Sequence, residues 1–193
     1  MLSKKLIYRK TEKENTKIII DFSKDKQEFK NFLDVYEILI KINISIPKIY
    51  EVNKQQSKIY MQDFGNDRFN KIYNKDNLYK LLKLAVDNII VIQNETNLKN
   101  LKNLKEYTFD DLKIELKEFV TYYIPNNKNL NFPTSKFYEL WKSIFYSQNY
   151  NMKSFVHKDF EFVNLFFLEN YESHLQCGII DFQSAFMGFI GWD

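Results

Sequence analysis

Four polar residues near the end of the sequence have the types and spacing that phosphoryl transfer requires. His157, Asp159 and Asn164 form the pattern H-x-D-x-x-x-x-N, and Asp181 follows in the run IIDFQ. The reaction needs a carboxylate that orients the acceptor hydroxyl and takes its proton, and an amide oxygen and a second carboxylate that hold magnesium. We therefore predict that Asp159 is the catalytic base. Asn164 and Asp181 are the predicted ligands of Mg²⁺, which prefers oxygen atoms.

Each of these residues also has an ordinary structural interpretation. An Asp or Asn before a strand is commonly a turn or cap residue, and a single His is commonly a satisfied core residue. The spacing, the apolar flanks and the late Asp181 occur together here, and this combination favours the catalytic interpretation. His157 is expected to be structural and to bond the backbone near the loop.

The elements around these residues would bring them together. The apolar runs 163–168 and 177–182 are predicted strands. If they pair as a hairpin, Asn164 and Asp181 lie next to each other.

The periodicity along the chain predicts a two-lobed α+β fold. The first part has strand-like runs and one helix after Asp25, and the pattern changes to helical near Gly65. Strands are predicted at 5–9, 16–22, 48–52 and 58–63, and helices at 77–93, 108–123 and 133–145. We interpret this as a protein-kinase-like fold. Residues 1–64 would be a partial, nucleotide-binding β lobe, and residues 65–193 a partial helical lobe with the catalytic loop and metal-binding hairpin.

The triplet Asp63-Phe64-Gly65 spells D-F-G, the metal-binding signature of protein kinases. It precedes the catalytic loop, whereas the metal-binding carboxylate must come from the hairpin after it. We therefore assign the segment to the hinge between the lobes, where its backbone would contact the adenine of ATP. The predicted hinge residues are Met61, Gln62, Asp63 and Phe64.

The late motifs resemble those of the aminoglycoside phosphotransferase/choline kinase-like superfamily. Residues 157–164 and the run IIDFQSA at 179–185 carry this resemblance. The form D-F-Q-x-A, followed by Gly188 and by Trp192-Asp193, is similar to the bacterial N-acetylmuramate/N-acetylglucosamine anomeric kinases of cell-wall recycling. The resemblance implies ATP-dependent phosphorylation of a small-molecule hydroxyl, most simply that of an amino sugar. It also implies that Asp193 braces the catalytic loop.

The sequence departs from this family in several places. It resembles a chain truncated at both ends, and it contains neither a G-x-G-x-x-G loop nor a Walker A motif. The strand that carries a phosphate-binding lysine in kinases reads IIID at 18–21, so Glu28 is expected to be a helix cap without a lysine partner. Choline, homoserine and aminoglycosides remain alternative acceptors. An inactive truncated pseudokinase is the non-enzymatic alternative.

Composition excludes several other classes. The net charge is +3, with lysines interleaved among acidic residues and only two arginines, which argues against a nucleic-acid partner. No apolar stretch approaches the roughly 20 residues of a membrane span. Cys177 is the only cysteine, so no intrachain disulfide can form and a reducing, cytoplasmic location is expected. Two histidines and one cysteine argue against a zinc site.

Overall fold

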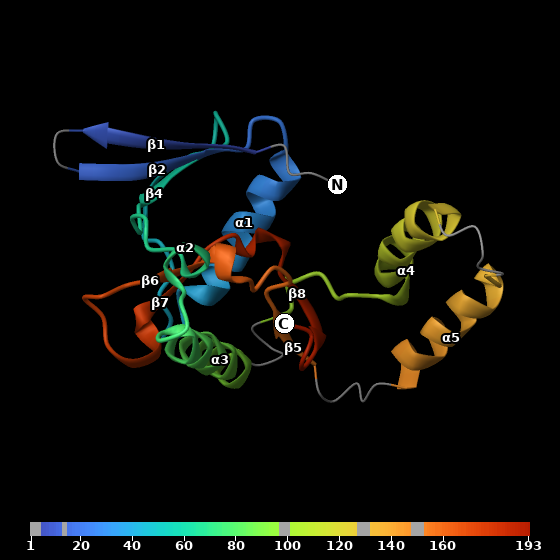
Figure 1. Cartoon of the computed structure of the whole chain (residues 1–193). Helices are drawn as coiled ribbons and strands as arrows, with labels where there is room; N and C mark the ends of the chain where they lie inside the picture. Colours follow the sequence, from blue (N-terminus) through green and yellow to red (C-terminus); the bar gives the residue numbers. More distant parts are fainter. Residues whose placement is uncertain (1–4, 13–14, 97–100, 127–131, 148–152) are drawn as a thin grey trace.

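A four-stranded antiparallel sheet forms the N-terminal part of the protein (Figure 1). The computed structural model describes residues 5–12, 15–96, 101–126, 132–147 and 153–193. The spatial order of the strands is β1-β2-β4-β3. Their bounds are β1 (Leu6–Glu12), β2 (Asn15–Asp21), β3 (Ile49–Asn53) and β4 (Lys58–Gln62). The β-branched run Ile18–Ile20 lies in β2, where such residues favour the extended backbone.

Helix α1 (Lys26–Leu39) joins β2 to β3 and connects the sheet to the rest of the molecule. The Asp25 side chain caps it by accepting a hydrogen bond from the Glu28 N–H at 2.9 Å. One face of the helix is buried, and its Phe32 ring lies 4.8 Å from the ring of Phe182, centroid to centroid. The helix therefore links the sheet to the segment that carries Asp181.

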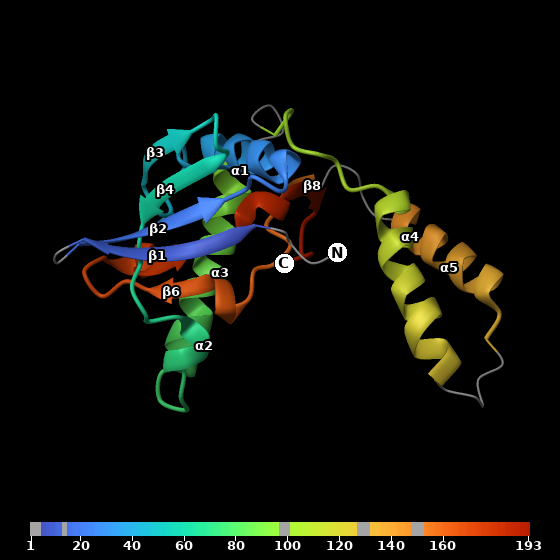
Figure 2. The ribbon, with the colours of Figure 1, turned by 90° about the horizontal axis from the view of Figure 1, so that it is seen from above.

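The middle of the chain is helical. Its helices are α2 (Phe69–Ile72), α3 (Leu78–Glu95), α4 (Phe109–Glu118) and α5 (Thr134–Ser147). A complete capping box, formed by Thr108 and Asp111, begins α4. A π-helical turn, Phe119–Tyr123, continues it toward Pro125. In both overall views α4 and α5 lie side by side, set apart from the sheet (Figure 2).

Two short strand pairs form the C-terminal part. The predicted hairpin is present, with β6 (Leu165–Phe167) antiparallel to β7 (Cys177–Ile179), but it is shorter than predicted. A 3₁₀ turn occupies Phe162–Asn164 because the Asn164 N–H donates to the Glu161 carbonyl. The second pair, β5 (Lys153–Val156) with β8 (Phe186–Phe189), was not predicted.

A continuous hydrophobic cluster joins the sheet to the helical part. It contains Phe22 near the end of β2, Val35 of α1, Leu81 of α3, and Leu165 and Ile179 of the late hairpin. The sheet, the helices and the late hairpin thus share one core, and the predicted α+β fold is confirmed. The lobe boundary at residue 64 stays a prediction. None of the helices in the described ranges is long and apolar enough to cross a bilayer.

Candidate active site

The loop after β5 is tied to the C-terminal residue. The Asp193 carboxylate accepts hydrogen bonds from the backbone N–H groups of His157 and Lys158, at 2.7 and 2.9 Å. Burial raises the pKa of Asp193, although the two N–H bonds act in the opposite direction. Lys158 has a φ of 81°, in the left-handed region that L-residues seldom occupy. These contacts hold the backbone immediately before Asp159 in an unusual conformation.

His157 is almost completely buried and lies against the hairpin. Its Nε2 is 3.0 Å from the Ile180 carbonyl oxygen, so Nε2 donates this bond. Burial lowers the pKa of His157 to about 4, and the bond to Ile180 only partly offsets this. Its Nδ1 is buried without a hydrogen-bond partner among the described residues. A neutral imidazole fits this environment, because a proton on Nδ1 would be buried and unsatisfied.

Asn164 is buried at the start of β6. Its Nδ2 donates to the Asp159 carbonyl oxygen at 2.9 Å, which leaves the amide oxygen Oδ1 as the group available to a metal. The Ile180 N–H donates to the Asn164 carbonyl at 3.1 Å. Through these two hydrogen bonds, Asn164 connects the loop that carries Asp159 to the segment that carries Asp181.

Asp181 follows β7 in a left-handed conformation, with a φ of 65°. Its Oδ1 accepts hydrogen bonds from the Lys5 ammonium and, at 2.9 Å, from the Gln183 amide. Burial opposes ionisation, but Lys5 and Gln183 outweigh it, so that the pKa of Asp181 is lowered. Asp181 is thus a carboxylate at neutral pH, as a metal ligand must be.

Asp159 has the opposite shift. Burial raises its pKa, and the nearby charge of Asp181 raises it further. Two carboxylates in one site therefore differ in proton affinity. This is the arrangement expected for a proton acceptor beside a metal ligand.

The donor set suits a hard cation whose coordination is completed by phosphate and water. Asn164 Oδ1 and the Asp181 carboxylate are oxygen donors on adjoining segments. Magnesium commonly takes only one or two carboxylates from the protein beside substrate phosphates. In the described part of the chain, no three His, Cys, Asp or Glu side chains gather as a metal site.

A largely apolar pocket opens between the sheet and the late hairpin. Ile7, Ile18 and Ile20 of the sheet line it on one side, and Phe166 and Ile180 line it on another. All four predicted hinge residues, Met61–Phe64, line its edge, together with Asp181. The Gln62 N–H is used within the fold, since it donates to the Lys48 carbonyl at 2.8 Å.

The D-F-G-like triplet lies between β4 and α2. Arg9 holds the Asp63 carboxylate through two contacts, at 2.7 and 2.9 Å, and its guanidinium also donates to the Gly65 carbonyl. These contacts connect β1 to the segment between the sheet and the helices. The Asp63 carboxylate is therefore paired with an arginine. Asp181, in contrast, follows Ile180, which is bonded to Asn164, the other predicted metal ligand.

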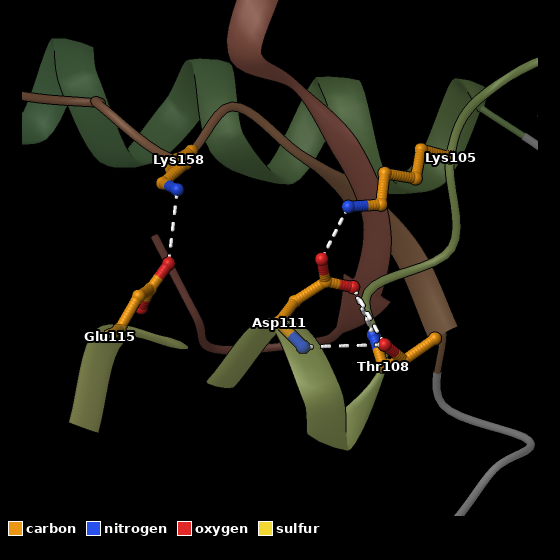
Figure 3. Close-up of polar contacts among 5 residues, drawn as sticks. All are labelled: Lys105, Thr108, Asp111, Glu115 and Lys158. Carbon is orange, nitrogen blue, oxygen red and sulfur yellow. Dashed lines mark hydrogen bonds and ion pairs between the residues drawn. The ribbon is translucent and has the colours of Figure 1, made fainter. Parts of the chain in front are cut away.

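A second cleft lies against α4 and includes Lys158 of the predicted catalytic loop in its lining. Figure 3 shows polar contacts among residues of this lining. In this view Lys158 points to Glu115 of α4, with a 3.0 Å ion pair, and Lys105 points to Asp111. Asp34 of α1 and Glu118 of α4 add two further carboxylates to the lining, and Ser184 lines it as well. The lining also includes Gln183, which lies two residues after Asp181.

The comparison with solved structures indicates the fold, whereas two other comparisons found no match. No protein-family model matches the sequence, and no curated protein matches it. The apo form of a thermostable mutant of aminoglycoside phosphotransferase APH(4)-Ia is similar, with a TM-score of 0.64 and 13% identity over 97% of this chain and 66% of that one. The GDP complex of aminoglycoside 2'-phosphotransferase-IIIa has a TM-score of 0.63 and 14% identity over 94% and 64%. The ternary complex of APH(2'')-IIa with streptomycin and ATP gives 0.54 and 13% over 95% and 67%.

The chain has the fold of the aminoglycoside phosphotransferases. It spans between 64% and 67% of the lengths of these three structures. At such low identity the similarity concerns the phosphotransferase fold and does not extend to the acceptor.

No lysine was predicted at this site, because residues 18–21 of the strand that carries the phosphate-binding lysine in kinases include none here. The strand expected to carry it, β2, presents Ile18 and Ile20 to the pocket. Lys5, immediately before β1, instead contacts Asp181 and lies 3.5 Å from the Glu28 carboxylate. The prediction that Glu28 has no lysine partner was therefore wrong. The alternation of Lys5, Ile7 and Arg9 on one strand face was the available signal, but its meaning depends on which strand borders the pocket.

Proposed function

We propose that this protein binds ATP with Mg²⁺ and transfers a phosphoryl group to a hydroxyl of a small molecule. One observation carries the proposal: the hinge segment Met61–Phe64 and Asp181 line the same pocket, and Asp159 and Asn164 adjoin Asp181. The ternary complex of a similar fold contains ATP together with streptomycin, which supports the choice of donor. ATP is a cytoplasmic substrate, so the proposal implies a cytoplasmic protein.

In this proposal the residues divide the work. Asp159 orients the acceptor hydroxyl and takes its proton, and its raised pKa makes it a better base than an ordinary carboxylate. Asn164 Oδ1 and Asp181 would hold Mg²⁺, which neutralises charge on the phosphates when bound. His157 and Asp193 act indirectly, because they hold the backbone immediately before Asp159 and connect it to Ile180.

The nucleotide base would lie in the apolar pocket. Its faces would contact the isoleucines of β1 and β2 on one side and Phe166 and Ile180 on the other. The backbone of the hinge segment would bond the edge of the base. Since the Gln62 N–H already bonds Lys48, that contact falls to other backbone groups of the segment.

We propose an amino sugar such as N-acetylglucosamine or N-acetylmuramate as the acceptor, on the D-F-Q-x-A motif at 181–185. The cleft against α4 is its proposed site, because Lys158, the residue before Asp159, lines it together with polar groups that suit sugar hydroxyls. A cationic acceptor of the aminoglycoside type is the second candidate. Asp34 and Glu118 of the cleft favour it, whereas the other two carboxylates of the lining, Asp111 and Glu115, are paired with Lys105 and Lys158.

The test is a radiolabelled phosphoryl-transfer assay with purified protein, MgATP and a panel of acceptors. Sugars, aminoglycosides, choline and homoserine are offered separately, and ADP release without acceptor is subtracted. Turnover with one class, lost in Asp159→Asn, supports the proposal and identifies the acceptor. Tight MgATP binding without transfer to any acceptor would support the inactive pseudokinase instead.

A further inference from the structure

Lys5 occupies a position that its sequence context does not suggest. Its side chain is only 8% exposed, although it lies at the beginning of an edge strand. Residues 6 and 7 pair with Asp21 and Ile20 of β2, so Lys5 continues the strand face that carries Ile7 and Arg9, both of which line the nucleotide pocket. Lys5 and Arg9 are four residues apart and lie about 13 Å from each other along an extended strand. Arg9 is at the hinge end of the pocket and Lys5 is at the Asp181 end.

Two carboxylates hold the Lys5 ammonium. It donates to Asp181 Oδ1 and lies 3.5 Å from Glu28 Oε1 of α1, whose side chain is 15% exposed. A charge with so little exposure is stable only when it is paired. Glu28 and Asp181 bring two negative charges to one ammonium, which leaves an excess of negative charge where the metal is proposed to bind.

Kinases commonly anchor the nucleotide phosphates with a strand lysine that is paired to a helix glutamate. In this chain β2 presents isoleucines to the pocket, whereas Lys5 of the neighbouring strand pairs with Glu28 of the helix that follows β2. A lysine is a flexible point charge that binds phosphate without a fixed geometry. It can therefore reach the same place from a different strand.

We propose that Lys5 is the phosphate-anchoring residue of the nucleotide site, and that it exchanges Asp181 for a nucleotide phosphate when Mg²⁺ binds; this rests on the proposed function. Without nucleotide, the ammonium neutralises Asp181. A divalent cation placed on Asp181 repels the ammonium, and the phosphates that arrive with it offer a new partner. Glu28 remains bonded throughout and keeps Lys5 directed into the site.

The first test compares nucleotides that differ in their phosphates. Calorimetric titration of adenosine, ADP and ATP with Mg²⁺ is carried out on the wild type, Lys5→Met and the matched control Lys54→Met, which changes an exposed lysine of the β3–β4 turn. We expect Lys5→Met to weaken ATP binding about tenfold or more, in line with a lost charge-assisted bond. Adenosine affinity should be unchanged, which also shows that the pocket is folded. The control should bind like the wild type.

A strand exchange sharpens the test. Ile20 pairs with Ile7 on the same face and lines the pocket, so Ile20→Lys in the Lys5→Met background returns an ammonium from β2. Recovery of a preference for ATP over adenosine would show that the site needs the charge and accepts either strand as its source. Equal ATP affinity in the wild type and Lys5→Met would overturn the role of Lys5 while leaving ATP binding intact. Absence of ATP binding by the wild type would overturn the proposed function and the role of Lys5 together.

A labelling experiment needs no variant. An acyl phosphate of ATP acylates a lysine close to the phosphates: the amine nitrogen bonds the acyl carbon and loses a proton, and ATP leaves as the carbon–oxygen bond breaks. Mass spectrometry of the digested protein should find the label on Lys5, suppressed by excess MgATP. ATP-protected label on another lysine, with Lys5 unmodified, would contradict the proposal.

Discussion

At the scale of single residues, the candidate site contains two carboxylates whose pKa values are shifted in opposite directions. Asp159 is pushed toward its protonated form by burial and by Asp181, so its pKa is raised. For Asp181, burial is outweighed by Lys5 and Gln183, so its pKa is lowered. If both carboxylates had ordinary pKa values, their proton affinities would not distinguish the proton acceptor from the metal ligand.

Asp159→Asn should strongly slow transfer and stabilise the fold at neutral pH. The raised pKa of Asp159 means that the folded chain binds this proton more tightly than the unfolded chain. Its contribution to stability is therefore present below the ordinary pKa and lost as the pH rises through the raised value. Asparagine never ionises. We expect the free energy of unfolding at pH 7 to increase in denaturant titration and the turnover number to fall about 10²–10⁴-fold.

The control for this prediction is Asp76→Asn, at an exposed position outside the site. It should change neither the unfolding midpoint nor turnover. A loss of stability in Asp159→Asn at pH 7 would contradict the environment assigned to Asp159.

His157 should make the fold sensitive to mild acid. Its pKa is about 4 in the folded chain because of burial, against about 6.5 in an unfolded one. Between these values only the unfolded chain binds the proton, so stability falls as the pH decreases from 6.5 toward 4. The loss is about 3–4 kcal/mol at most, from the difference between the two pKa values at roughly 1.4 kcal/mol per pKa unit. Chemical denaturation across this pH range measures it.

His157→Gln lacks this titration and serves as the comparison. The wild type should be the more stable protein at pH 7, and the gap between the two should narrow toward pH 4. A constant gap would show that His157 is not buried as a neutral ring.

The sequence was sufficient to select those candidate site residues that are recognised by their spacing within one segment. The pattern from His157 to Asn164 and the later Asp181 could be found without coordinates because one loop and one hairpin connect them. Lys5 could not be found in this way. Its role depends on the pairing of β1 with β2 and on the approach of Asp181, which is distant in the sequence.

At the scale of elements, the same distinction holds. The caps at Asp25 and Thr108 and the β-branched run in β2 are local signals, and the corresponding helices and strand are present. The β5–β8 pair was missed because each strand has only four residues and its partner lies in another part of the chain. Neither strand carries a strong pattern of its own.

The fold should require glycine at position 178, where β7 packs against Phe64. A Cβ there would lie 2.7 Å from the Phe64 ring and 3.1 Å from a methyl group of Leu168. Gly178→Ala would force the ring away from β7. We expect a loss of about 1–3 kcal/mol in the free energy of unfolding, measured by denaturant titration, together with weaker ATP binding.

Reducing the ring tests the cause. In the double variant Gly178→Ala/Phe64→Leu, the smaller side chain leaves room for the new methyl group. The two changes should therefore cost less together than the sum of their separate effects. Additive costs would mean that Gly178 is needed for a reason other than Phe64.

At the scale of the whole molecule, two openings share Gln183 in their linings. The apolar pocket lies between the sheet and the late hairpin, and the cleft against α1 and α4 includes Lys158 in its lining. Lys158 is connected to α4 through Glu115, and the segment before α4 is connected to it through Lys105 and Asp111 (Figure 3). If the pocket receives ATP and the cleft receives the acceptor, changes in the two places should affect different kinetic constants.

Glu115→Gln should raise the KM for the acceptor and leave the KM for ATP unchanged. Glu115 lines the cleft and does not line the apolar pocket. An acceptor in the cleft can therefore draw the Glu115 carboxylate away from Lys158 and bond it through a hydroxyl or ammonium group. Loss of one hydrogen bond to a charged group costs about 1.5–3 kcal/mol, or roughly a tenfold or greater increase in KM. The increase should be larger for a cationic acceptor than for a neutral amino sugar, because only the former loses an ion pair. The control is Glu139→Gln on α5, an exposed change of the same type outside the cleft. An effect of Glu115→Gln on the KM for ATP alone would show that the cleft against α4 is not the acceptor site.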